Sequence, residues 1–74
     1  MSMGRPDEVI IHPDGSRTEI KWRRASHPGG DRSRIRKVIG SDGITREVWH
    51  EVFDQGGQMI HQEPKPIKGR GGTV

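Results

Sequence analysis

The amino-acid sequence predicts an all-β protein, a single small domain in which about five antiparallel strands form a twisted meander with little or no helix. One observation behind this prediction is a set of turn signals, Asp-Gly at residues 14–15 and 42–43 and Gly-Gly at 56–57. Another is that short runs rich in β-branched and aromatic residues flank each turn, as is typical of β-hairpins. In addition, no stretch shows a convincing helical period of apolar residues.

The intervals between the turns define the expected elements. The strands are predicted at residues 8–12, 17–23, 34–39, 44–53 and 58–62. The second of these alternates strictly, with Thr18, Ile20 and Trp22 on one side and charged residues on the other. Residues 24–33 form the longest loop. We therefore expect a flexible lead-in at 1–7, the β domain at 8–63, and a basic tail rich in proline and glycine at 64–74.

Length and composition limit what this domain can be. The chain has 74 residues, of which 27% are hydrophobic, so the expected core is thin and the stability marginal. There is no cysteine, which excludes disulfides and cysteine-based zinc sites. No apolar run approaches the roughly 20 residues that span a bilayer, so no membrane span is expected.

The charge is unevenly distributed. The net charge is only +3, but residues 17–37 hold eight lysines and arginines against two acidic residues. Arginine outnumbers lysine nine to four, and the planar guanidinium group suits phosphate. The alternative is a solvated basic surface without a ligand. The arginines predicted to contact phosphate are Arg23, Arg24, Arg34, Arg36 and Arg46.

His27 and Asp31, four residues apart in the long basic loop, are the first candidates for chemistry. Such a pair can cleave RNA by acid–base catalysis, in which a base removes the proton of the ribose 2′-OH and an acid protonates the departing 5′-oxygen. Because the 2′-OH is the nucleophile, neither a metal nor another cofactor is required. The alternative is an exposed loop histidine beside a turn aspartate.

His50 is the next candidate, as a member of a dyad that reaches across strands or as part of an ordinary surface pair. His12 and His61 lie near strand ends, and the four histidines lack any regular ligand spacing, so no metal site is predicted. Trp22 is expected in the core. For Trp49, burial and stacking on a nucleic-acid base remain equally open.

The order of these features resembles the cytotoxic ribonuclease domain of ribosome-inactivating colicins. The shared layout is a basic hairpin with a tryptophan near its end, a histidine loop, an Asp-Gly hairpin, a strand ending in Phe53-Asp54 and a basic proline-rich end. The resemblance implies that Asp31 acts as the base and His27 as its acid–base partner. The resemblance also implies that a functional arginine in the C-terminal basic segment of that family corresponds to a position near Lys68 or Arg70, which are therefore further candidates for binding RNA phosphate. Where the family has an aspartate after the tryptophan, this chain has Arg23.

The segment 48–61 is also similar to the C-terminal ends of polymorphic toxins of contact-dependent and Rhs-type bacterial systems. This resemblance implies His50 and Glu51 as catalytic residues. It also implies a carrier protein N-terminal to this domain, an acidic immunity protein as partner, and delivery into the cytoplasm of a target cell. The predicted function is thus a toxin-type ribonuclease that acts on RNA without metal. The alternatives are a non-catalytic nucleic-acid-binding module and a structural or protein-interaction module.

Overall fold

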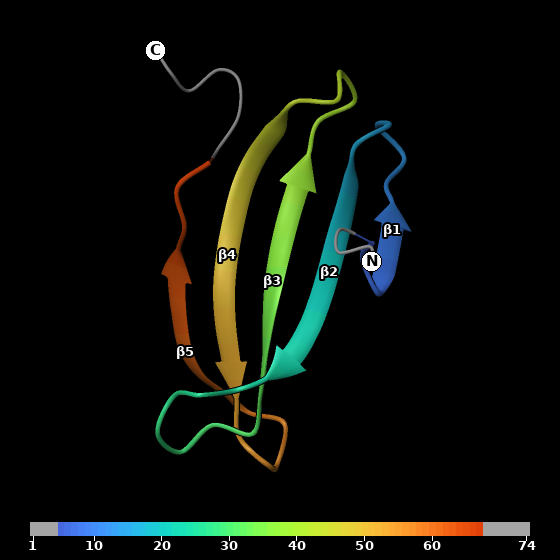
Figure 1. Ribbon diagram of the computed structural model, residues 1–74. Coiled ribbons are helices and arrows are strands. Elements are labelled where there is room, and N and C mark those ends of the chain that lie inside the picture. Colours follow the sequence, from blue (N-terminus) through green and yellow to red (C-terminus); the bar gives the residue numbers. More distant parts are fainter. Residues whose placement is uncertain (1–4, 68–74) are drawn as a thin grey trace.

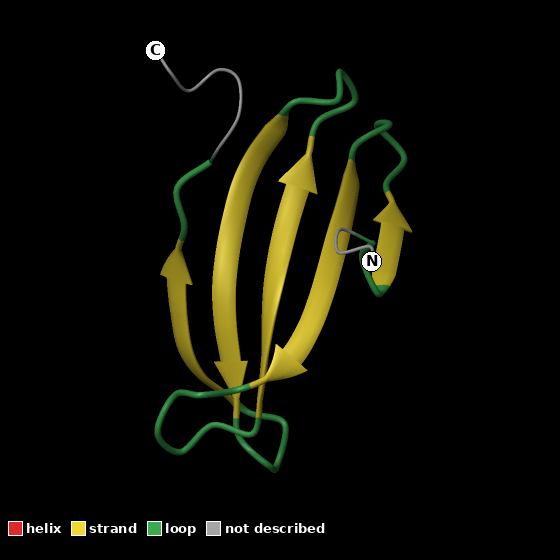
Figure 2. Ribbon diagram, in the orientation of Figure 1, coloured by secondary structure: helices red, strands yellow, loops and turns green. Residues whose placement is uncertain are grey.

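The computed structural model describes residues 5–67 of the chain, and the predicted fold class is confirmed. Five antiparallel strands form one open sheet in the order β1-β2-β3-β4-β5 (Figure 1). The strands are β1 (Glu8–Ile11), β2 (Arg17–Arg24), β3 (Arg32–Ile39), β4 (Thr45–Phe53) and β5 (Met59–Pro64). Within residues 5–67 there is no helix, and hence none that is long and apolar enough to cross a membrane (Figure 2).

Three strands extend further than the sequence predicts, β2 by one residue to Arg24 and β3 and β5 by two residues each. β3 begins at Arg32 because Arg24 and Arg32 still face each other at the end of the β2–β3 ladder. β5 runs to Pro64, and the next residue, Lys65, donates a backbone hydrogen bond of 2.8 Å to the carbonyl of Val48. A proline is tolerated there because β5 is an edge strand. Of the expected lead-in and tail, residues 1–4 and 68–74 lie outside the described part.

Three short turns share one mechanism. An aspartate carboxylate accepts a hydrogen bond from the backbone N–H two residues later, and a glycine takes a positive φ that other residues avoid. The aspartates are Asp14, Asp42 and Asp54, and the glycines are Gly15, Gly43 and Gly57 with φ of 90°, 84° and 85°. These turns join β1 to β2, β3 to β4 and β4 to β5, which explains why turn chemistry predicts three of the four connections in the meander.

The cross-strand register divides the side chains between two faces, because residues that pair across an antiparallel ladder point the same way. We call one the glutamate face; a row of it consists of Trp22, Arg34, Glu51 and Gln62. We call the other the histidine face; its adjacent row consists of Lys21, Ile35, His50 and Glu63. His50 and Glu51 therefore lie on opposite faces.

The apolar core is as thin as the composition predicts. The buried hydrophobic residues of the described chain are Ile20, Ile39 and Val52. Ile20 belongs to the glutamate face and Val52 to the histidine face, and Figure 1 shows one layer with no second layer over either face. A single layer of this kind depends on interactions between side chains of neighbouring strands.

Glu51 is the centre of those interactions. Its carboxylate, 0% exposed, accepts hydrogen bonds from Arg34 Nε at 2.6 Å, Arg36 Nη2 at 3.0 Å and Gln62 Nε2 at 2.8 Å. The guanidinium group of Arg34 also lies 5.3 Å from the ring centroid of Trp22. The Trp22 indole N–H in turn donates a hydrogen bond of 2.8 Å to a carboxylate oxygen of Glu8. One chain of polar contacts thus runs through all five strands.

The environment of Glu51 keeps it ionised. Burial by itself raises the pKa of this carboxyl, but the hydrogen bonds from Arg36, Arg34 and Gln62 outweigh burial and lower the pKa to about 2 from 4.5. A folded-state pKa below that of the unfolded chain contributes stability that is complete above about pH 4.5 and is lost as the pH falls through about 2. A shift of this size corresponds to about 3 kcal/mol.

We predict that Glu51→Gln destabilises the fold by about 3 kcal/mol, because both arginines lose their anionic partner while the amide can accept only one of their hydrogen bonds well. For a domain of this size, the melting temperature should fall by about 10–20 °C, measured by circular dichroism. The variant should also lose the acid-dependent part of stability below about pH 4.5. The matched control is Glu47→Gln on the same strand and face. Glu47 is exposed, and its carboxylate accepts a hydrogen bond from Trp49 Nε1. Equal melting temperatures for the two variants would contradict the central role of Glu51.

Candidate functional site

Three histidines from separate segments meet on the histidine face. The ring of His27, from the β2–β3 loop, stacks on that of His61 of β5, with centroids 4.6 Å apart and 24° between planes. His50 of β4 meets the same His61 ring edge-on, at 6.0 Å between centroids. All three side chains are half-buried. We call these residues, together with Glu63, the histidine cluster.

The long loop brings His27 to this place. In Figure 1, the segment between β2 and β3 crosses the lower end of the sheet toward β5 before it returns to β3. Its closed shape is held by backbone hydrogen bonds from Gly30 N to His27 O (2.9 Å) and from Asp31 N to Phe53 O (2.8 Å). The loop therefore spans two strands and delivers a histidine that is 34 residues from its stacking partner in sequence.

Gly30 permits the loop to lie this close to the sheet. A Cβ atom at this position would lie 2.6 Å from Cγ1 of the fully buried Val52 and 3.0 Å from the Cβ of Ala25. Val52 is β-branched and stiff, so it cannot turn away without cost. The absence of a side chain at Gly30 is therefore a condition for the contact between His27 and His61.

Glu63 completes the cluster from the edge strand. It pairs directly with His50 across the β4–β5 ladder, and its Oε1 lies 3.1 Å from Nε2 of His61. One donor atom from each of His50, His61 and Glu63 lies within 4.8 Å of the other two. The Glu63 carboxylate is exposed and lies within hydrogen-bond distance of the His61 ring.

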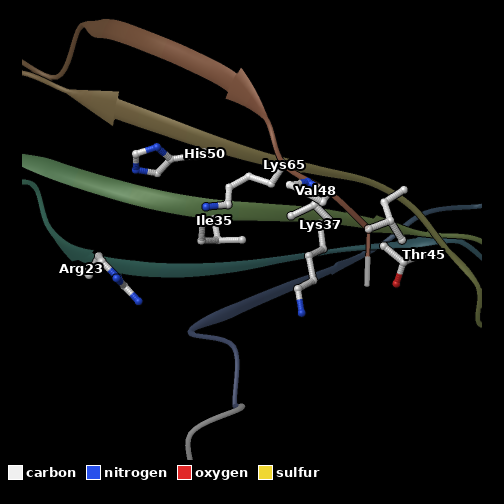
Figure 3. Close-up of a pocket in the computed structure, with 9 residues that line it drawn as sticks. Arg23, Ile35, Lys37, Thr45, Val48, His50 and Lys65 are labelled. Atoms are coloured by element: carbon white, nitrogen blue, oxygen red, sulfur yellow. The ribbon is translucent and has the colours of Figure 1, made fainter. Parts of the chain in front are cut away.

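A basic groove of about 430 Å³ extends from His50 along the same face. Figure 3 shows Arg23, Lys37 and Lys65 around a floor of Ile35 and Val48. Among residues 5–67, no carboxylate lines this groove. A second hollow of about 330 Å³ shares Arg23, Ile35 and Lys37 and continues toward β1 through Pro6, Glu19 and Lys21.

The groove cations are available to a ligand. The ion pairs of the described residues involve Arg17, Arg34, Arg36, Arg46 and His61. Arg23, Lys37 and Lys65 take part in none of them. Glu19, the cross-strand partner of Lys37, lines the adjoining hollow and is itself paired with Arg17 at 2.7 Å. Three positive charges that form no ion pair among the described residues, above an apolar floor, make a site suited to an extended polyanion.

The residues predicted from sequence to hold phosphate are thus spread over several environments. Arg23 lines the groove, whereas Arg34 and Arg36 lie on the other face and are bound to Glu51. Arg46 is paired with Asp42 in the β3–β4 turn at 2.8 Å. The rest are Arg24, which is exposed on the glutamate face, and Lys68 and Arg70, which lie outside the described residues.

The predicted catalytic residues are partly brought together. His27 and His50 both join the histidine cluster, although the sequence offered them as members of two different sites. Asp31 holds the loop closed through its backbone, and its side chain is exposed. Glu51 is buried on the opposite face from His50, so these two neighbours in sequence do not form a pair.

His61 and Glu63 were not among the predicted site residues. Their spacing in an edge strand places both on one face, which is a signal in the sequence. The sequence does not give the register of β5 against β4. A β-bulge between Val52 and Phe53 sets this register, and it therefore determines that His61 and Glu63 lie on the same face as His50. Lys37 and Lys65 likewise become recognisable only once the strands are aligned.

Comparisons with protein-family models, curated proteins and solved structures found no match for this chain. The resemblance to colicin ribonucleases and polymorphic toxins therefore stays a prediction. What is established is a small all-β domain with a basic groove and a histidine cluster on one face.

We predict that Gly30→Ala displaces the β2–β3 loop, because the added methyl group overlaps Val52. The expected destabilisation is about 1–3 kcal/mol, the usual cost of overpacking. Proton NMR should show that the ring resonances of His27 and His61 move toward those of unstacked imidazoles. Gly56→Ala is the control, since Gly56 has no positive φ and its nearest neighbour to an added Cβ is 3.4 Å away. Unchanged ring resonances in Gly30→Ala would contradict the role given to this glycine.

Proposed function

We propose that this domain binds RNA in the basic groove and cleaves it at the histidine cluster by metal-independent transphosphorylation. The observation that carries the proposal is the convergence of histidines from β4, β5 and the β2–β3 loop at the end of a groove lined by three unpaired cations. Proton donors and acceptors beside a phosphate site are what cleavage at a ribose 2′-OH requires.

His50 and His61 are the residues suited to the proton transfers. The stacked rings of His27 and His61 leave no space for a phosphate between them. His50 and His61 meet edge-on, and a ring nitrogen of each lies within 4.8 Å of the other, so both can contact one phosphodiester. His27 then acts as a positioning residue that packs against His61.

The steps follow from this arrangement. His61, oriented by Glu63, removes the proton of the 2′-OH, and the 2′-oxygen attacks the adjacent phosphorus. The bond from phosphorus to the 5′-oxygen breaks, and His50 donates a proton to that oxygen. The products are a 2′,3′-cyclic phosphate and a free 5′-OH. Arg23 and Lys65, which line the groove together with His50, stabilise the negative charge of the pentavalent phosphorane.

The biological setting we propose is that of a bacterial toxin domain. Such a domain, delivered by a carrier protein into a target cell, has to be neutralised in the cell that produces it. The basic groove, whose lining within residues 5–67 holds Arg23, Lys37 and Lys65 and no carboxylate, is suited to an acidic immunity protein. The resemblance of segment 48–61 to polymorphic toxin ends supports this setting.

We predict that the protein cleaves a short oligoribonucleotide in EDTA and that His50→Ala and His61→Ala each lower the rate by about 10²–10⁴-fold. Phosphorus NMR should detect the 2′,3′-cyclic phosphate. The matched substrate has a single 2′-deoxynucleotide at the cleavage site, and it should resist cleavage there because the nucleophile is missing. His12→Gln is the protein control, since His12 lies outside the cluster and bonds to Thr18.

Three outcomes separate the competing assignments. Loss of cleavage in Asp31→Asn with normal cleavage in His61→Ala would favour the His27 and Asp31 pair over the cluster. Cleavage of the 2′-deoxy substrate would exclude transphosphorylation. RNA that is bound but never consumed by the wild-type protein would leave a non-catalytic nucleic-acid-binding module as the function of the groove.

The groove makes a separate prediction about affinity. For a single-stranded oligonucleotide, neutralisation of about three phosphates gives a slope of log K against log salt of about −2, and each lost cation reduces its magnitude by about 0.7. Lys37→Ala should show this reduction in fluorescence anisotropy titrations. Arg46→Ala should not, because Arg46 is paired with Asp42 away from the groove lining. The reverse ranking would place the polyanion at the β3–β4 turn instead.

A further inference from the structure

We propose that His50, His61 and Glu63 also form a binding site for a divalent transition-metal ion, with Zn²⁺ as the representative ion. This inference stands on the geometry of the edge strand and does not rest on the proposed ribonuclease. It concerns a site that no spacing of histidines along the sequence reveals, because the ligands come from two strands whose alignment is set by the fold.

The strand geometry places three donor groups on one side of the sheet. His61 and Glu63 are two residues apart on β5, so their side chains point to the same face. His50 on β4 is the direct cross-strand partner of Glu63. Ligands carried by paired strands are held more accurately than ligands on loops.

The donor atoms are close to the separation that a metal needs. In a tetrahedral site with zinc–ligand bonds of about 2.0–2.1 Å, the ligand atoms lie about 3.3 Å from one another. His61 Nε2 and Glu63 Oε1 already lie 3.1 Å apart, and all three donor atoms lie within 4.8 Å. The limit of 4.8 Å exceeds the tetrahedral spacing by about 1.5 Å, so side-chain movement of at most this size brings the three donor atoms to a metal ion.

The chemistry of the donors suits zinc. Two imidazoles and one carboxylate are a ligand set that Zn²⁺ uses where a fourth position stays open for water or another ligand. Imidazole favours zinc, copper and nickel over calcium and magnesium, which prefer oxygen ligands. The site is therefore expected to select a transition metal.

Nearby cations oppose a metal ion here and shape what it binds. Arg23 and Lys65 lie in the groove beside His50, while Glu63 supplies the negative charge among the three ligands. This environment weakens the affinity for a bare dication and favours an anion, such as a phosphate oxygen, in the fourth position. If the ribonuclease proposal holds, the ion also occupies the imidazole nitrogens that transfer protons, so Zn²⁺ should inhibit cleavage and EDTA should restore it.

The test is a titration of the full chain with ZnCl₂ by isothermal calorimetry, with no RNA present. We expect one equivalent bound by the wild type. His61→Ala and Glu63→Gln should each weaken binding by at least tenfold, since even the loss of an outer partner costs about 10–100-fold. Co²⁺ provides an independent readout, because a tetrahedral site gives an intense visible absorption band that an octahedral aquo ion does not.

The control is His12→Gln, which removes the histidine outside the cluster and should bind Zn²⁺ as the wild type does. Circular dichroism establishes that each variant is folded. No saturable binding by the wild type, or equal affinity in His61→Ala, Glu63→Gln and His12→Gln, would overturn the proposal. Zinc binding without any RNA cleavage would support the metal site while removing the ribonuclease, so the two proposals fail separately.

Discussion

The hydrogen bonds that Arg34, Arg36 and Gln62 donate to the buried carboxylate of Glu51 are the interaction on which the sheet depends. A single-layer sheet of this size has few apolar contacts to stabilise it, and its buried hydrophobic residues are divided between two faces. A charged network that joins neighbouring strands takes the place of a core. It costs desolvation of an ion, and the arrangement is favourable only because the partners are placed to satisfy the carboxylate.

The network around Glu51 determines which face of the sheet is free to bind a ligand. Arg34 and Arg36, two of the arginines predicted from the sequence to contact phosphate, are bound to Glu51. On the same face, guanidinium groups cover the rings of Trp22 and Phe53, with Arg32 4.3 Å from the centroid of Trp22 and Arg34 4.9 Å from that of Phe53. On the opposite face, the groove cations Arg23, Lys37 and Lys65 form no ion pair within residues 5–67, and the histidine cluster lies beside them. Stability and proposed function are thus assigned to different sides of the same strands, which follows from the alternation of side chains along a strand.

The sequence predicts the strands well because their turns have strong local chemistry, with aspartate acceptors and glycines at positive φ. It does not predict the site, because the site depends on register. Without the bulge between Val52 and Phe53, the register that begins at Phe53 and Met59 would put His61 opposite Glu51 and turn Glu63 away from His50. A shift by one residue exchanges the faces of a strand. His27 was predicted as a candidate from its loop, but its contact with β5 depends on the close approach at Gly30, which is a tertiary effect.

Because the two faces are separate, mutations in the histidine cluster can test the functional proposals without disturbing the Glu51 network. Substitutions at His50, His61 or Glu63 remove no contact with Glu51, so an effect on cleavage or metal binding reports on the cluster when the fold is intact. The cluster also lies where the sheet constrains it least, since β5 is an edge strand paired on one side with β4. Glu63 is exposed and able to move, whereas His50 is held within the sheet and His61 is held by stacking. If both proposals hold, one adjustable ligand beside two fixed rings lets the same residues either orient a proton acceptor or close around a metal ion.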